Sequence, residues 1–319
     1  MPPEFTSIYF DPTTDFGFKK LFGEEANKDL LMDFLNSMLP EKHQIAELEF
    51  TKTEQLPPDR DDRKAFFDVA CKTANGETFI VEMQKSRMTY FMDRSLYYTA
   101  FPIQKQGVLG TWNFKLNCVY FIGVLDFEYD ENLEYWKERQ LLRSFALYDN
   151  NQVLMTDNLQ FKFLQLRFFN KELHELETKF DKWCYFLRQL ETFDHIPQIL
   201  NEPIFMKAFE VAAIEKMDGA QLALYEMSKR KKYESQLVAE EFERQRIEST
   251  EKATKEGLAK GMEKGMEKGT EKGMELKDVL FVIRLFEKGY ASEAISDLAN
   301  IPLEKVNKII AEHLDSLKK

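Results

Sequence analysis

Two β-rich segments joined by three residues constrain the fold of this chain more than any other feature. Residues 65–73 and 77–84 are rich in Val, Ile, Phe and Thr, and Ala74-Asn75-Gly76 separates them. Such segments around a short connection that contains Asn-Gly predict a β-hairpin. The first half of the chain must therefore build a sheet around this hairpin.

The segments on either side of the hairpin alternate between helical and β patterns. Thr13 or Thr14 can cap a short helix that carries Phe18, Leu21 and Phe22 on one side. A second amphipathic helix is expected near Asn27, and further segments predict a strand at 45–56, a helix at 88–105 and a strand buried on both faces at 117–126. The order helix, strand, hairpin, helix, strand indicates an α/β core.

Four further segments extend this core toward the C-terminus. Residues 141–148 and 159–168 predict two strands, and residues 173–190 and 205–217 predict two amphipathic helices. The 28 Phe residues of the chain become scarce after Phe209, where Glu, Lys and then Gly replace them. This change separates a globular part from a polar tail.

The tail begins as a polar, helix-forming segment from Gln221 to about Glu256 and continues as a repeat with Gly at every fourth position from 257 to 273. Each Gly in a helix costs about 1 kcal/mol relative to Ala, and the repeat places like charges four residues apart. We therefore expect residues 221–275 to form a semi-flexible connector.

The last residues, 276–319, predict a small unit of three helices. These are expected at 276–287, from Ser292 as N-cap to Ala299, and from Pro302 as first helical residue to Leu314. Their arrangement is similar to a helix-turn-helix, although the final helix offers few base-reading side chains near its start. DNA reading and protein contact both stay open for this unit.

The charge balance excludes a protein that coats nucleic acid through its overall charge. The chain has 44 basic and 55 acidic residues, a formal net charge of -11. Contact with DNA must then come from a local patch. Residues 85–120 offer one, because they set five cations against the single acid Asp93: Lys85, Arg87, Arg94, Lys105 and Lys115.

The cysteine, histidine and hydropathy patterns argue against a disulfide-stabilised protein, a structural zinc protein and a membrane-spanning protein. Cys71, Cys118 and Cys184 are widely spaced in apolar surroundings, which predicts buried, reduced thiols in a cytoplasmic protein. The four scattered histidines lack zinc-site spacing, so surface positions and no structural zinc are expected. No apolar segment is long enough to predict a membrane span.

The residues with the strongest chemical signal are Asp68, Glu82 and Gln84. Glu82 and Gln84 point to one face of their strand because strand side chains alternate. Asp68 joins them if the hairpin loop has three residues, since Thr73 then pairs with Glu77 and Asp68 falls opposite Glu82. We predict such an odd register shift, made by this loop or by another bulge between Asp68 and Glu82. A two-residue loop would place the two acids on opposite faces.

Two carboxylates that converge in this way can bind a hard cation such as Mg²⁺, with the backbone carbonyl of Met83 as a further ligand. A metal bound there can polarise a phosphoryl oxygen and lower the pKa of a water molecule. Acids on a solvated strand also match this pattern by chance. Arg94 with Tyr97 can equally be a surface pair, and Lys85 with Arg87 the solvated end of a strand.

The sequence around these acids resembles the PD-(D/E)XK nuclease core, and its flanking residues are similar to the Rpn family of recombination-promoting nucleases, also called putative transposases. The resemblance covers roughly residues 8–240. It rests on Asp15-Phe16-Gly17-Phe18-Lys19, Phe67-Asp68-Val69, Ile80-Val81-Glu82-Met83-Gln84, Arg94, Tyr97, Asp181-Lys182-Trp183 and Leu224-Tyr225-Glu226.

This resemblance implies a metal-dependent DNA endonuclease in which Asp68 and Glu82 bind Mg²⁺ or Mn²⁺. Gln84 stands where most of the superfamily has Lys, and a neutral amide can only orient the attacking water. Asp15 matches the acid of the first helix. The residues expected to contact double-stranded DNA are Lys19, Lys85, Arg87, Arg94 and Tyr97.

The resemblance also implies an architecture. We expect a PD-(D/E)XK restriction-endonuclease-like core with a mixed sheet flanked by helices at 8–170, and a helical extension at 171–220. The connector and the terminal helical unit follow, and the terminal helices are expected to form a homo-oligomer. The competing hypothesis is a catalytically inactive nuclease fold that serves as a DNA- or protein-interaction module.

Overall fold

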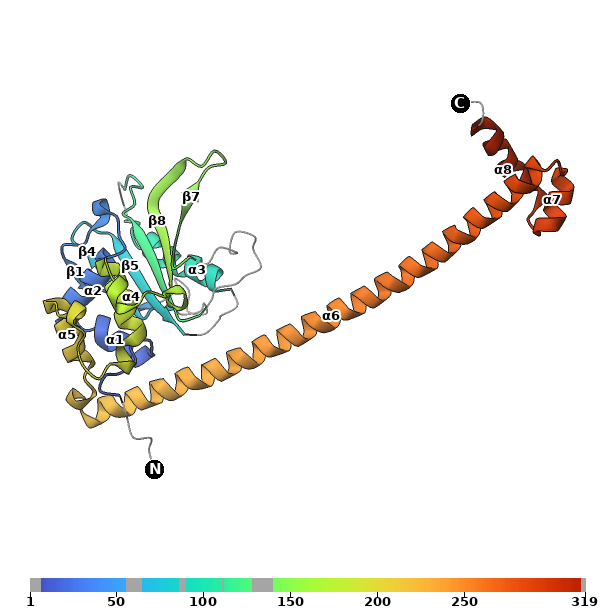
Figure 1. Ribbon diagram of the computed structural model, residues 1–319. Coiled ribbons are helices and arrows are strands. Elements are labelled where there is room, and N and C mark those ends of the chain that lie inside the picture. Colours follow the sequence, from blue (N-terminus) through green and yellow to red (C-terminus); the bar gives the residue numbers. More distant parts are fainter. Residues whose placement is uncertain are drawn as a thin grey trace. The chain divides into compact units, whose positions relative to one another are not determined.

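The structure of the 319-residue chain is a computed structural model (Figure 1). It describes residues 7–55, 65–85, 90–108, 110, 112–127 and 140–316. The chain divides into two compact units, Met1–Glu241 and Phe242–Lys319. The first unit contains the expected core together with the helical extension.

A mixed six-stranded sheet forms the centre of the first unit. In spatial order its strands are β1 (Leu48–Phe50), β4 (Val69–Thr73), β5 (Thr78–Gln84), β6 (Val119–Leu125), β8 (Leu154–Gln165) and β7 (Leu142–Tyr148). The three central strands β5, β6 and β8 are parallel, whereas β1, β4 and β7 pair antiparallel to their neighbours. This topology matches the predicted α/β core with a mixed sheet.

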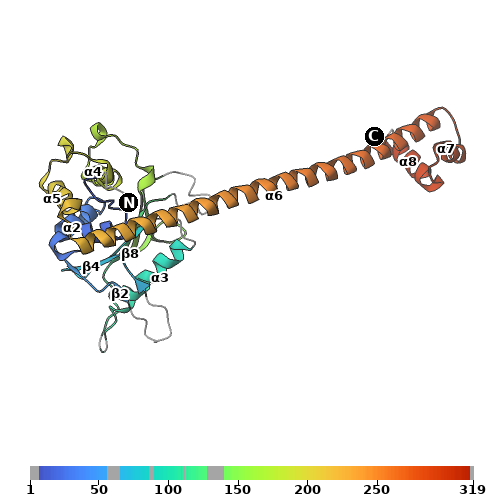
Figure 2. The same ribbon diagram turned by 90° about the horizontal axis from the view of Figure 1, so that it is seen from below.

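Helices cover both faces of the sheet. The helices α1 (Asp15–Phe22), α2 (Lys28–Asn36), α4 (Lys179–Gln189) and α5 (Pro203–Ala212) pack on one face, and α3 (Phe91–Gln104) lies on the other (Figure 2). Strand β5 serves both layers, because Phe79 and Val81 enter the first core and Ile80 enters the second. Its continuous apolar sequence follows from burial on both sides.

Several predicted elements differ from the observed ones in length. The strand expected at 45–56 is two short strands, β1 and β2 (Glu54–Gln55), and β2 pairs with β3 (Ala65–Phe66) in a separate two-stranded sheet. Residues 51–53 between the two pairings are exposed, so no buried face holds one straight strand there. The helix expected at 173–190 begins only at Lys179, where Thr178 and Asp181 form a capping box.

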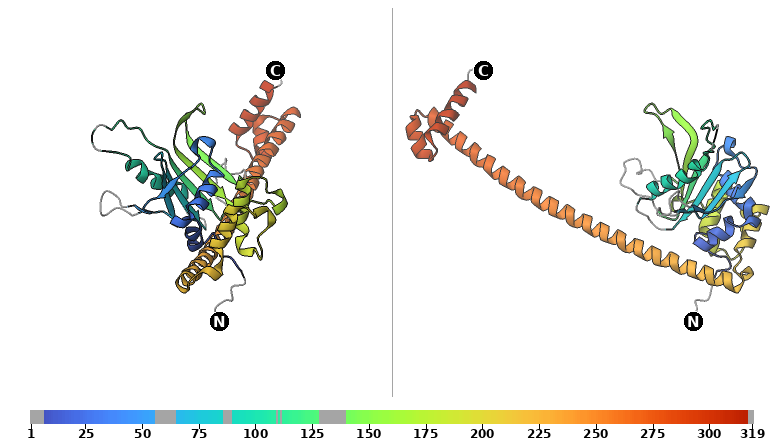
Figure 3. Two further views of the ribbon diagram at one scale, coloured as in Figure 1. Left: turned by 90° about the vertical axis from the view of Figure 1, so that its left-hand side faces the viewer. Right: turned by 180° about the vertical axis from the view of Figure 1, so that it is seen from behind.

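Strand β8 also begins earlier than predicted and ends earlier, since residues 166–168 form a 3-10 turn. Its first residues pair with β7 alone, and the two strands continue past the rest of the sheet (Figure 3). The helix expected at 205–217 is α5 followed by a 3-10 turn at Ile214–Lys216. These shifts leave the order of the elements unchanged.

The long helix α6 (Gly219–Glu287) includes the segment expected to be a semi-flexible connector, and it runs through all five repeat glycines. Each glycine keeps its backbone hydrogen-bonding groups, and no atom outside the helix approaches these positions within 4 Å. The repeat therefore lowers helix stability without ending the helix.

The second unit ends in helices α7 (Ser292–Ala299) and α8 (Leu303–Ser316). Ala291 is the N-cap of α7, so Ser292 is its first residue rather than its cap, and Pro302 precedes α8. A small hydrophobic cluster joins the end of α6 to both helices through Val282, Ile295 and Val306. The three predicted helical segments are present, although the first is the end of α6.

The cysteines follow the prediction and one histidine does not. Cys71, Cys118 and Cys184 are free, buried thiols. His43, expected at the surface, is buried because it packs edge-to-face on Tyr120 with ring centroids 5.4 Å apart. No helix in the described part of the chain is long and apolar enough to cross a lipid bilayer.

Candidate nuclease site

The hairpin between β4 and β5 has the three-residue loop that brings the two acids together. Thr73 donates its N–H to the carbonyl of Glu77 at 2.9 Å, and Gly76 has a φ of 87°. A left-handed residue at this position is typical of a loop that ends in a glycine bulge. The register pairs Val69 with Val81, so Asp68 lies directly opposite Glu82, as predicted.

Asp68 and Glu82 are also linked through their backbones. The N–H of Asp68 donates to Glu82 Oε1 at 3.2 Å, and the N–H of Met83 donates to Asp68 Oδ2 at 2.8 Å. Glu82 therefore accepts a hydrogen bond from the backbone of Asp68, and Asp68 accepts one from the backbone of Met83, the residue after Glu82. This exchange fixes both side chains at the carboxyl end of β5.

Burial and nearby negative charge raise the pKa values of both acids. Glu82 is only 4% exposed, and burial, followed by the charge of Asp68, raises the pKa of Glu82 to about 8. Burial likewise raises the pKa of Asp68, although the hydrogen bond from Met83 and the charge of Lys19 oppose this. A buried and a half-buried carboxylate with raised pKa values form a functional-site candidate that a cation would stabilise.

Helix α1 supplies an acid and a cation to the same place. Lys19 Nζ lies 2.9 Å from Asp15 Oδ1 and 3.5 Å from Asp68 Oδ1. Burial opposes ionisation of Asp15, but its hydrogen bond and charge interaction with Lys19 outweigh burial and lower its pKa. Asp15 therefore joins the site through Lys19.

Arg94 from α3 lies over the other side of the acids. Its Nη2 donates to Glu82 Oε2 at 2.9 Å and to Gln84 Oε1 at 3.2 Å. The guanidinium carbon also lies 5.2 Å from the centroid of the Tyr98 ring. The cation expected to contact phosphate is thus bonded to the motif itself in this structure.

The remaining residues expected to contact DNA lie around this centre. Lys85 follows β5 and is partly buried; burial lowers its pKa, against the charges of Asp15 and Asp68. Tyr97 is 46% exposed and packs edge-to-face on Phe101. Arg87 lies outside the described residues.

The donor set of this centre fits a hard divalent ion. Asp68 and Glu82 present carboxylate oxygens within one hairpin, and oxygen ligands are those that Mg²⁺ and Mn²⁺ favour. The carbonyl of Glu77 points toward β4, and carbonyl directions alternate along a strand, so the carbonyl of Met83 points to the same side. These three residues would bind the ion.

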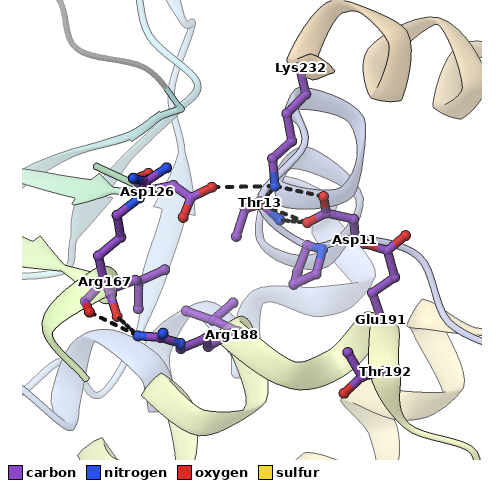
Figure 4. Close-up of a pocket in the computed structure, with 11 residues that line it drawn as sticks. Asp11, Thr13, Asp126, Arg167, Arg188, Glu191, Thr192 and Lys232 are labelled. Carbon is purple, nitrogen blue, oxygen red and sulfur yellow. Dashed lines mark hydrogen bonds and ion pairs between the residues drawn. The ribbon is translucent and has the colours of Figure 1, made fainter. Parts of the chain in front are cut away.

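A second polar network, in which Lys232 contacts Asp11 and Asp126, was not expected from sequence. Lys232 of α6 lies 2.8 Å from Asp11 Oδ2 and 3.3 Å from Asp126 Oδ2, beside a pocket of about 490 Å³ (Figure 4). The hydroxyl of Tyr225 accepts from the N–H of Asp11 at 2.9 Å, and Ser228 Oγ accepts from the N–H of Phe16 at 3.0 Å. The start of α6 therefore holds α1 in place.

The signal for this network was present in the spacing of Tyr225, Ser228 and Lys232. Residues three and four apart share one helix face, so a Tyr, Ser and Lys at these intervals can contact one partner surface. The partners could not be identified, because Asp11 and Asp126 lie far away in sequence.

The fold and the site together define the PD-(D/E)XK nuclease class. Residues 12–241 match the family model described as PD-(D/E)XK nuclease family transposase, and the chain belongs to this family. No curated protein and no solved structure matches the chain. Membership indicates a nuclease or transposase-like function and suggests DNA binding, in a class that typically uses divalent metals.

Proposed function

We propose that this protein is a metal-dependent DNA endonuclease that hydrolyses phosphodiester bonds. Asp68, Glu82 and Gln84 would form its active site. The observation that carries the proposal is the register of the hairpin, which sets Asp68 directly opposite Glu82. Directly opposed residues have Cβ atoms about 4.5 to 5.5 Å apart, so both carboxylates can reach one ion.

Asp68, Glu82 and the carbonyl of Met83 would hold Mg²⁺ or Mn²⁺. When bound, such an ion supplies Lewis-acid polarisation of the phosphoryl oxygen and a more acidic water. Gln84 lies two residues beyond Glu82 on the same face, and its amide orients the attacking water by hydrogen bonds. It cannot provide the positive charge of a Lys at that position.

Positive charge at the site comes instead from residues outside the motif. Lys19 lies 3.5 Å from Asp68, and Lys85 interacts electrostatically with both Asp15 and Asp68. Both ammonium groups can bind the phosphates of double-stranded DNA, and Tyr97 can extend this contact. Arg87, outside the described residues, stays a predicted DNA contact. Asp15 keeps Lys19 oriented toward Asp68.

Arg94 has two roles under this proposal. In the absence of metal its guanidinium donates a hydrogen bond to Glu82 and favours the ionised carboxylate, and when a metal ion binds Glu82 the guanidinium becomes available to a phosphate. The alternative function, a catalytically inactive fold that binds DNA or protein, is favoured by the same contact. In an inactive fold the guanidinium would stay hydrogen-bonded to Glu82 and Gln84, and the site would need no metal ion to balance its negative charge.

Nicking of supercoiled plasmid by the full chain tests the two functions against each other. We expect Mg²⁺-dependent nicking that Asp68→Asn and Glu82→Gln each abolish, and DNA binding without turnover in Ca²⁺. Asp149→Asn is the matched control, because this exposed acid lies in the β7–β8 turn. Equal nicking by wild type and Asp68→Asn would remove Asp68 from the reaction, and binding without nicking would favour the inactive fold.

We further propose a cytoplasmic role in promoting DNA recombination, with the C-terminal helices as the homo-oligomer contact. The three buried free thiols support a reducing compartment. The hydrophobic cluster of α6, α7 and α8 gives the second unit a core of its own, as an assembly module requires. Light scattering of the full chain measures the oligomeric state directly.

A further inference from the structure

Three potential metal ligands of different chemistry meet where the central strands β5 and β6 begin, at the end of the sheet away from the nuclease site. His43 ends a short 3-10 helix, Glu77 precedes β5 and Cys118 precedes β6. One ligand atom from each of the three lies within 4.8 Å of the other two. Glu77 directly precedes β5 and Glu82 lies five residues further along it, so the two sites are about 16 Å apart along one strand.

The strand register explains why these residues meet. Thr78 pairs with Val119 in the parallel ladder, which places Glu77 beside Cys118 at the start of neighbouring strands. Phe79 and Tyr120, the next residues but one, point into the core of the α2 and α4 face, and their rings stack at 4.9 Å. Glu77 and Cys118 share that face, away from Glu82.

The contacts of His43 differ from those of a histidine that is buried only for packing. Its Nδ1 lies 2.6 Å from Glu77 Oε1, and its ring packs against Tyr120. Among the described residues its Nε2 is buried without a hydrogen-bond partner, 3.9 Å from Asp157 Oδ2. A buried imidazole between two carboxylates and beside a thiol has the surroundings of a metal ligand.

We propose that His43, Glu77 and Cys118 bind a divalent transition metal ion, with Zn²⁺ as the best match. One imidazole, one carboxylate and one thiolate form a donor set of intermediate softness, which suits Zn²⁺ and not Mg²⁺. Tetrahedral zinc with bonds of about 2.0 to 2.3 Å needs ligand atoms about 3.3 to 3.8 Å apart, so shifts of about 1 Å complete the site.

Binding rearranges protons without any redox step. The Cys118 thiol loses its proton to solvent as the bond from sulfur to metal forms. His43 Nδ1 binds the ion, and the ring proton then resides on Nε2, where the carboxylate of Asp157 can accept it. A carboxylate behind a ligating histidine is the usual outer partner of such a site. A water molecule would take the fourth position.

Cobalt substitution of the full chain gives a direct spectroscopic test. After treatment with a chelator, titration with Co²⁺ should produce the visible bands of tetrahedral cobalt and a near-ultraviolet thiolate-to-cobalt band, saturating at one equivalent per chain. Cys118→Ser should remove the thiolate band. Cys184→Ser is the matched control, because Cys184 is also a buried free thiol but lies in α4, and it should leave the spectrum unchanged.

Two further variants separate this site from folding defects and from the nuclease site. Glu77→Gln keeps an oxygen to accept from His43 and should fold, but Co²⁺ affinity should fall at least about tenfold. Asp68→Asn should bind Co²⁺ at this site as wild type does. The proposal is overturned if Cys118→Ser and wild type give the same thiolate band, if wild type gives none, or if Glu77→Gln binds with unchanged affinity.

Discussion

Arg94 Nη2 lies 2.9 Å from Glu82 Oε2 and 3.2 Å from Gln84 Oε1, so one guanidinium spans the acid and the amide of the nuclease motif. The positive charge of Arg94 lowers the pKa of Glu82, against the larger effects of burial and of Asp68. The protonation state of the proposed metal ligand thus depends on a residue of another element.

Removal of Arg94 should therefore change the pH dependence of cleavage. The ionised form of Glu82 binds metal, so activity rises with pH on the acid side of the profile. In Arg94→Met the pKa of Glu82 rises further, and the acid limb of kcat/KM should move up by about one pH unit. Arg94→Lys keeps the charge and should shift less. An acid limb that stays in place in Arg94→Met would contradict control of Glu82 by Arg94.

The raised pKa of Glu82 also makes a prediction for the metal-free protein. A carboxyl group whose pKa is higher in the folded than in the unfolded state stabilises the fold fully below its unfolded pKa. This contribution is lost as pH rises from about 4.5 to about 8. Thermal unfolding in a chelator should show a Tm that falls across this range, and Mg²⁺ should restore it at the upper end. Glu82→Gln should flatten the decline, and an equal slope in that variant would locate its cause elsewhere.

Gly76 should contribute to the register on which the site depends. Its φ of 87° disfavours L side chains, and an added Cβ would lie 2.5 Å from Asn117 Nδ2. Gly76→Ala should cost about 1 to 2 kcal/mol and lower the Tm by several degrees. Gly257→Ala is the matched control, because no atom outside its helix lies within 4 Å, and it should leave the core transition unchanged. Equal Tm values for Gly76→Ala and wild type would show that another conformation accommodates the loop.

Much of the site could be predicted because strand chemistry is local. The loop Ala74-Asn75-Gly76 determines the pairing of Thr73 with Glu77, and this pairing alone places Asp68 opposite Glu82. Alternation along β5 then puts Gln84 on the same face as Glu82. The roles of these residues in catalysis stay predictions until cleavage is measured.

Interactions between distant segments could not be predicted in the same way. Arg94 was expected to face DNA, yet Glu82 and Gln84 lie within its reach once α3 packs on the sheet. His43 was expected at the surface, because nothing near it in sequence shows that β5 and β6 bring Glu77 and Cys118 beside it. In both cases the partner of the side chain comes from another element. The surface position of His43 was wrong, whereas contact of Arg94 with DNA stays a prediction.

The contact of Lys232 with Asp11 and Asp126 should contribute strongly to stability. Lys232 and Asp11 are largely buried, and removal of one partner leaves buried carboxylates without their cation. Lys232→Met should destabilise the first unit by about 3 kcal/mol in chemical unfolding. Lys231→Met removes the same charge from an exposed neighbour and should have little effect. Similar unfolding midpoints for the two variants would show that the buried network is weak.

Truncation of α6 should separate its role in the first unit from its role in assembly. The described contacts that join α6 to α1 and Asp11 come from Tyr225, Ser228 and Lys232, and the first compact unit ends at Glu241. A chain that ends before Gly257 keeps these contacts but lacks the hydrophobic cluster of the terminal helices. It should retain metal-dependent nicking while its oligomeric state or DNA affinity changes, as measured by light scattering beside the plasmid assay. A chain that ends at Asp218 should unfold at lower temperature because α1 loses its support. If the truncation before Gly257 stayed folded but lost all nicking, the terminal helices would be part of the active unit.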